Sequence, residues 1–352
     1  MRPLEGVRVV ELAALGPLEH AGMLLADLGA SVLRVHRPGA PGDPRNPILR
    51  GRRHLELDLK TEDGRACLLD EVRDADVLLE GFRPGVMERL RLGPHDLAEV
   101  APGLVYGRMT GWGQSGPRAA RAGHDINYTA ETGALWATRT DGARPTAALN
   151  LVGDNGGGSL YLVVGVLAAL LERRRTARGA VIDAAIVDGV SSLLQTVRGL
   201  QTEGRWGQEP AANLFDSGAP FYDTYRCADG EYMAVGAIEP QFYDAFVRGL
   251  GLDPAGLPDR ADRTTWPTLR ARFAEMFAAH TRAHWARVFA PLDACVSPVW
   301  SLAEAGHSDH LVSRRTLLPD STGGWSAAPA PRIHPLPAPD DSRAPERTHA
   351  NS

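Results

Sequence analysis

The sequence predicts an α/β protein with a doubly wound parallel sheet, followed by a smaller α+β part. Short aliphatic runs alternate with helical segments from residue 7 to about residue 110, which is typical of parallel sheets. With 352 residues, of which 43% are hydrophobic, the chain can form more than one core. A stretch rich in Gly, Pro, Asn and Gln at 202–218 then separates this region from one of different composition.

The alternation begins with a β-α-β unit near the N-terminus. Aliphatic runs at 7–12 and 31–35 predict buried strands, and the amphipathic segment at 20–28 between them predicts a helix. A helix between two strands allows them to run parallel. The pattern continues with a helix at 64–72, a strand at 77–79, a short helix at 84–90 and a strand at 104–109.

A formal dinucleotide-binding motif follows the last of these strands. It is Gly111-Trp112-Gly113-Gln114-Ser115-Gly116. Such a motif requires a helix directly after it, because the helix N-terminus binds the pyrophosphate. Pro117 and a polar stretch follow instead, so the sequence argues against a nicotinamide cofactor.

The most informative stretch is residues 150–159, Asn150-Leu-Val-Gly-Asp-Asn-Gly-Gly-Gly-Ser159, which leads into an apolar segment at 160–171. A carboxylate, three glycines and a helix start place Asp154 beside backbone N–H groups, where an anion can be held or formed. The apolar segment is too short to span a bilayer. We further expect a strand at 179–185, one helix at 187–201, strands around the turn at 228–230, helices at 241–249, 266–280 and 282–289, and an extended or disordered tail beyond about residue 326.

Charge and cysteine content exclude several classes of protein. A formal net charge of -5 argues against nucleic acid and acidic membranes as partners. Cys67, Cys227 and Cys295 are far apart in sequence and form neither a disulfide framework nor a metal-ligand motif. No leader-like segment opens the sequence. We therefore expect a cytoplasmic protein without a bound metal.

Several segments, taken together and in order, resemble the CaiB/BaiF (class III) CoA-transferase superfamily and, within it, the α-methylacyl-CoA racemases. They lie at 3–12, 26–30, 81–85, 123–128, 237–243 and 293–296 and around Asp154. The resemblance implies a Rossmann-like large domain at 1–186, a linker at 187–222 and a small α+β domain at 223–310. It also implies that a return linker and Pro-rich tail at 311–352 pack on the large domain.

The resemblance further implies an interlocked homodimer, in which each active site lies between the large domain of one chain and the small domain of the other. From the residues alone, a plain two-domain monomer is equally allowed. The substrate implied is an acyl-CoA, and no further cofactor is expected because coenzyme A enters as the substrate thioester.

The racemase resemblance also implies roles for individual residues. His124 and Asp154 would be the two acid/base groups that move the α-proton through an enolate, and Glu239 would pair with the histidine. Asp125 and Asn150 would supply supporting hydrogen bonds. Backbone N–H groups of 156–158, at the expected helix start, are candidates for stabilising the enolate.

Coenzyme A carries phosphate groups that favour Arg and Lys at strand ends and helix starts. By resemblance, the CoA- and substrate-binding positions are Arg37, Leu57, Asp58, Leu59, Lys60, Gly81, Phe82, Arg83, Arg89, Gly123, His124, Asp125, Ile126, Asn127 and Tyr128.

Two other functions remain open on the sequence. A class III CoA-transferase would use Asp154 as a nucleophile that attacks the thioester. Asp154 is common to both enzymes, whereas a second proton-transfer group such as His124 is needed only by the racemase, which we therefore favour. A catalytically idle CoA-binding protein on the same fold is the third possibility.

Overall fold

The computed structural model describes residues 1–139, 144–320 and 322–336. Its main sheet is parallel throughout, with the strand order β3-β2-β1-β4-β5-β6. This is the Rossmann order, in which the chain reverses direction across the sheet between β1 and β4. The predicted α/β class is confirmed. The strands are β1 (Arg8–Leu12), β2 (Ser31–His36), β3 (Arg52–Glu56), β4 (Val77–Glu80), β5 (Val105–Thr110) and β6 (Ala180–Ala185).

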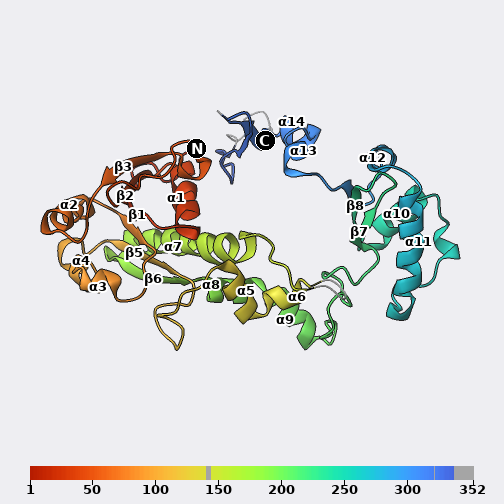
Figure 1. Ribbon diagram of the computed structural model, residues 1–352, viewed down its shortest axis with the longest axis horizontal. Coiled ribbons are helices and arrows are strands. Elements are labelled where there is room, and N and C mark those ends of the chain that lie inside the picture. The colour runs from red at the N-terminus through yellow and green to blue at the C-terminus, as the bar shows by residue number, and fades with distance from the viewer. Residues whose placement is uncertain (140–143, 321, 337–352) are drawn as a thin grey trace, which may run out of the picture.

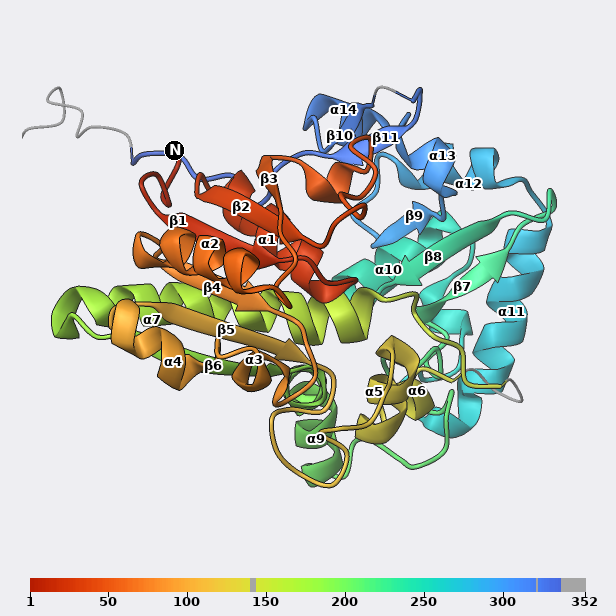
Figure 2. The same cartoon turned by 60° about the vertical axis from the view of Figure 1, so that its left-hand side comes forward.

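Helices cover both faces of this sheet, because neighbouring strand residues point to opposite faces. Val9 packs in the core under α1 (Pro17–Asp27) and α7 (Tyr161–Thr176), whereas Val10 packs in the core on the other side. That other core is covered by α2 (Glu62–Arg73), α3 (Val86–Arg89) and α4 (Pro94–Val100). Figure 2 shows α7 lying along the strands of the sheet.

A second, antiparallel sheet is formed by β7 (Tyr222–Arg226), β8 (Tyr232–Gly236) and β9 (Val296–Pro298). It packs against α10 (Pro240–Gly249), α11 (Trp266–Ala278) and α12 (Arg282–Phe289) around an aromatic core that includes Phe246, Phe273 and Phe277. Figure 1 places this sheet and its helices on the opposite side of the molecule from the parallel sheet.

The chain crosses between the two sheets twice (Figure 1). It leaves the parallel sheet through α8 (Ile186–Leu193) and α9 (Gln195–Thr202), and returns through α13 (Leu302–Ala305) and α14 (Asp309–Ser313) to the hairpin of β10 (Leu317–Pro319) and β11 (Trp325–Ala327). The N-terminal amine of Met1 donates to the carbonyl of Ile333 at 3.1 Å, so the returning segment ends beside the start of the chain. Residues 337–352 of the predicted tail lie outside the described residues.

Two predicted helices differ from those observed. The helix predicted at 187–201 is divided at Leu194 into α8 and α9. The helix predicted to start after the glycine stretch begins earlier, at Leu151, because a π-helix (Leu151–Leu160) continues directly into α7. Its glycines permit close packing: a Cβ on Gly157 would lie 2.7 Å from the Val190 nitrogen on α8.

The combined helix, Leu151–Thr176, has 26 residues, so the expectation that it is too short to cross a membrane is wrong on length. Its length and mean hydropathy of 1.4 satisfy the requirement for a span, as those of a core helix in a soluble protein also can. Leu162, Val163 and Val166 are buried in the core between this helix and the parallel sheet. The helix therefore has a packing role in the folded chain.

Candidate active site

His124 stands at the start of α5 (Asp125–Thr132), which is followed by α6 (Ala134–Ala137). It occupies the N-cap position, and its backbone N–H donates to the Asn127 side-chain oxygen at 3.0 Å. The His124 side chain is exposed to solvent. The loop after β5 thus ends by presenting an imidazole at a helix N-terminus.

Asp154 lies in the first turn of the π-helix and is half-buried. Its backbone N–H donates to Oδ2 of Asp125 at 2.7 Å, and Asp125 is itself buried. Gly16, which precedes α1, has a φ of 79°, and a Cβ there would lie 3.2 Å from Oδ2 of Asp154. The starts of α1, α5 and the π-helix therefore converge on this carboxyl group.

The environment of Asp154 makes it titrate near neutrality. Burial raises its pKa to about 6, the like charge of Asp125 also raises it, and His124 lowers it. The carboxyl group and the imidazole are thus close enough to affect each other. A carboxyl that titrates near the working pH can both accept and return a proton.

A cavity of about 260 Å³ opens beside His124. One wall is Tyr128, whose ring meets Trp112 edge to face at a centroid distance of 4.8 Å. A Cβ on Gly111 would overlap the Tyr128 ring, and one on Gly123 would lie 2.7 Å from it. The glycine motif after β5 therefore makes room for an aromatic wall, and no helix directly follows it, as predicted.

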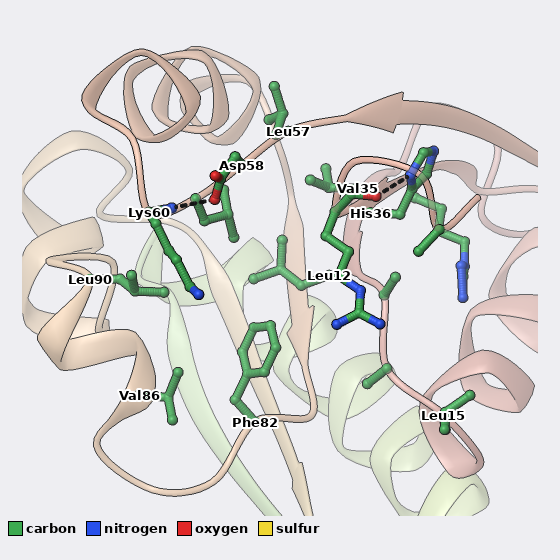
Figure 3. A pocket seen from close by; sticks show the side chains of 16 residues that line it. Leu12, Leu15, Val35, His36, Leu57, Asp58, Lys60, Phe82, Val86 and Leu90 are labelled. Carbon is green, nitrogen blue, oxygen red and sulfur yellow. Dashed lines mark hydrogen bonds between the residues drawn. The ribbon is translucent and has the colours of Figure 1, made fainter. Parts of the chain in front are cut away.

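A larger cavity of about 520 Å³ lies at the carboxyl ends of β1, β2, β3 and β4. This is the edge where open α/β sheets bind nucleotides, next to the point where the strand order reverses. Figure 3 shows Lys60 reaching past Leu90 into this space, opposite the ring of Phe82. Of the predicted CoA positions, those that line it are Arg37, Leu57, Asp58, Leu59, Lys60 and Phe82.

The other predicted CoA positions are distributed differently. Arg83 is in the smaller cavity together with Gly81, and Phe82 contributes to both cavities. Arg89 lines neither cavity. Asn150 is exposed and precedes the π-helix. The remaining positions belong to the α5 start: Gly123, His124 and Tyr128 line the smaller cavity, whereas Asp125, Ile126 and Asn127 do not.

Two polar residues of the larger cavity were missed by sequence reasoning. Arg34 is only 4% exposed and ion-paired to Glu19, and His36 is 6% exposed. Both lie on β2 and their side chains line the cavity. The signal was available, since the end of the second strand is where Rossmann folds place the residue that reads the ribose. Here that strand end carries Arg34, His36 and Arg37 and no carboxylate.

Glu239 is not brought to His124 and Asp154 within one chain. It precedes α10 and is exposed. Its charge raises the pKa of the Cys295 thiol, after burial and Asp293, so its electrostatic neighbour is in the same part of the fold. Figure 1 shows α10 and α5 well separated across the molecule.

The backbone groups predicted to stabilise an enolate are not at a helix start. The helix begins at Leu151, so residues 156–158 lie inside it, where N–H groups bond to carbonyls of the preceding turn. The start of α5 offers an alternative. In the described chain the N–H groups of Asp125 and Ile126 have no backbone acceptor, as is usual for a first helical turn. Among the residues that the structure describes, no group of three or more His, Cys, Asp or Glu side chains could hold a metal ion.

The chain is similar to known proteins in sequence and in fold. A family model described as CoA-transferase family III matches residues 4–348. The mouse (Mus musculus) protein named alpha-methylacyl-CoA racemase is 47% identical over 335 residues, which are 95% of this chain and 87% of the relative. The human (Homo sapiens) protein of the same name is 45% identical with the same coverage. The crystal structure of a CAIB/BAIF family protein from Brucella suis superposes with a TM-score of 0.80 at 25% identity, covering 94% of this chain and 92% of that one.

Proposed function

This chain belongs to CoA-transferase family III, and from that premise we propose that it inverts the α-methyl stereocentre of a 2-methyl-branched acyl-CoA. The observation that carries the proposal is the pair of His124 and Asp154, a solvent-reachable imidazole and a half-buried carboxyl group within electrostatic range of each other. The similarity of this chain to proteins named alpha-methylacyl-CoA racemase supports the same reaction.

In this reaction Asp154 removes the proton from one face of the α-carbon, and His124 delivers a proton to the opposite face of the same carbon. Each group exchanges its role in the reverse direction, which requires a carboxyl and an imidazole of similar basicity. The enolate formed between the two steps carries negative charge on its oxygen. In this proposal the N–H groups of Asp125 and Ile126, which have no backbone acceptor in the described chain, donate to that oxygen, and the helix dipole reinforces them.

The larger cavity holds the nucleotide end of coenzyme A in this proposal. Its apolar wall of Leu12, Leu57 and Phe82 suits the adenine, and its cationic side chains suit the phosphates. The cavity and the smaller one share Phe82, so the pantetheine arm would pass this ring to reach His124.

We expect Arg37→Ala and Lys60→Ala each to weaken binding of coenzyme A about tenfold, because each removes a charge-assisted contact to phosphate. Titration calorimetry with coenzyme A and with dephospho-coenzyme A would measure the loss and show which residue meets the 3′-phosphate. Arg73→Ala is the control, since Arg73 is exposed on α2 and paired with Asp70. Unchanged affinity in both cavity variants would refute this placement.

The separation of Glu239 from His124 supports an interlocked homodimer, in which Glu239 reaches the site of the partner. We expect Asp154→Asn and Glu239→Gln chains, each nearly inactive alone, to recover about half of the wild-type activity when co-expressed as mixed dimers. One of the two sites then has His124, Asp154 and Glu239 intact. Two-tag purification followed by an activity assay would measure the recovery.

The matched control is the mixed dimer of Asp154→Asn with His124→Gln. Both changes lie on the parallel-sheet side of the molecule, so every site lacks one group and no recovery is expected. Equal inactivity of both kinds of mixed dimer would show that Glu239 does not act on the partner's site.

The proposed function is tested by incubating the protein with an aliphatic and an aryl 2-methylacyl-CoA in D₂O and following α-deuteration by mass spectrometry. Exchange at the α-carbon together with loss of optical activity supports the racemase. Absence of exchange, with acyl transfer to an added carboxylate and trapping of acylated Asp154 by hydroxylamine, would identify a transferase instead. Binding of coenzyme A with neither reaction would identify an idle binding protein.

A further inference from the structure

Tyr128 is a buried tyrosine whose hydroxyl has no hydrogen-bond partner among the residues that the structure describes. Its side chain is 7% exposed and lines the cavity beside His124. In the described part of the chain, its hydroxyl makes no hydrogen bond. The hydroxyl oxygen is not fully enclosed, so a group that enters the cavity can accept its proton. By contrast, the hydroxyl of Tyr106, which is buried on β5 of the parallel sheet, donates to the carbonyl of Leu92 at 3.0 Å.

The surrounding backbone holds the Tyr128 ring in one place. Gly111 and Gly123 press against it so closely that neither could carry a side chain without moving the ring. Trp112 contacts it at an interplanar angle of 83°. The position of the hydroxyl is thereby set before any ligand enters, which is a requirement for effective electrostatic stabilisation.

Helix geometry directs the ring toward the reacting groups. Tyr128 is in the first turn of α5, and side chains on a helix lean toward its N-terminus. That end carries His124 and the unpaired N–H groups of Asp125 and Ile126. The phenol and these N–H groups therefore approach the same region.

The electrostatic surroundings keep the phenol protonated. Burial raises the pKa of Tyr128 above its ordinary value, and the negative charge of Asp154 raises it further, while Arg83 lowers it. At neutral pH the group is thus a hydrogen-bond donor near a carboxylate and a guanidinium. The guanidinium has no acceptor, and among the described residues the phenol forms no hydrogen bond to the Asp154 carboxylate.

We propose that the hydroxyl of Tyr128 donates a hydrogen bond to the thioester oxygen of the bound acyl-CoA and stabilises the charge that develops there. This inference rests on the proposed racemase function. No covalent bond forms and no proton leaves the phenol. The oxygen gains a donor from a side chain in addition to backbone N–H groups, and the interaction strengthens as the enolate forms.

The test is Tyr128→Phe, which keeps the ring and removes only the hydroxyl. We expect kcat for α-proton exchange in D₂O to fall about a hundredfold while KM changes less than about twofold, because the bond is made chiefly in the transition state. Tyr106→Phe is the matched control and should keep wild-type kcat. Far-UV circular dichroism and calorimetric binding of coenzyme A check that both variants fold and bind.

If the wild type exchanges and Tyr128→Phe exchanges at the same rate, this inference is overturned and the proposed function stands. The same holds if kcat falls only in step with weaker coenzyme A binding and lower thermal stability, as loss of packing would cause. If the wild type shows no exchange with either substrate, the proposed function and this inference fail together.

Discussion

Replacing Asp154 by asparagine is expected to lower kcat for α-proton exchange about a thousandfold, because the amide can neither accept nor return the proton. The substitution keeps the size of the side chain and the backbone N–H that donates to Asp125. Exchange of the α-proton in D₂O measures the effect directly. Asp70→Asn, on the exposed surface of α2, is the control and should retain wild-type exchange.

The pH dependence gives a second view of the same group. Asp154 can act as a base only when ionised, so exchange that begins on Asp154 should rise as the pH increases through about 6. Removing the neighbouring like charge in Asp125→Asn should lower the pKa of Asp154 and move this limb to lower pH. If the rise of the exchange rate stays at the same pH in Asp125→Asn, the group that controls this rise is not Asp154.

The second large effect concerns folding. Glu11→Ala is expected to reduce the free energy of unfolding by about 3–5 kcal/mol, because it leaves the buried Arg52 guanidinium without its carboxylate and removes one of the two carboxylates beside Arg34. Glu11 is fully buried on β1; its Oε2 accepts from Nε of Arg52 at 2.7 Å, and its Oε1 lies 3.5 Å from Nε of Arg34. Arg34 lines the larger cavity, so coenzyme A binding should weaken as well.

Urea denaturation of the wild type and of Glu11→Ala measures this loss, when the midpoints and slopes of the two unfolding curves are compared. Glu172→Ala is the matched control, since Glu172 pairs with Arg175 on the exposed end of α7. Exposed pairs contribute less than about 1 kcal/mol. Equal stability of the two variants would mean that the ion pairs of Glu11 with Arg52 and Arg34 do not stabilise the sheet.

The parallel sheet could be predicted because each central strand is marked by an aliphatic run that any buried parallel strand needs. The edge strand β3 could not, since its sequence Arg52-Arg53-His54-Leu55-Glu56 lacks such a run. Arg52 becomes buried only because Glu11, distant in sequence, supplies its counter-charge. A polar or charged side chain can be buried when a partner forms hydrogen bonds with it. Such a partner often comes from a distant segment, and the local sequence pattern does not reveal it.

The same limit applies to the site. The order and types of residue in the sequence determined the α/β class, the chemical candidates His124, Asp154 and Glu239, and the cationic positions Arg37 and Lys60. Tertiary structure alone decided that burial and the neighbouring Asp125 would raise the pKa of Asp154, and that the glycine stretch would be a π-helix. It also decided that α10, which Glu239 precedes, would lie apart from α5 in one chain. Local periodicity reflects which face of an element is buried, whereas distances between charges depend on how distant segments pack.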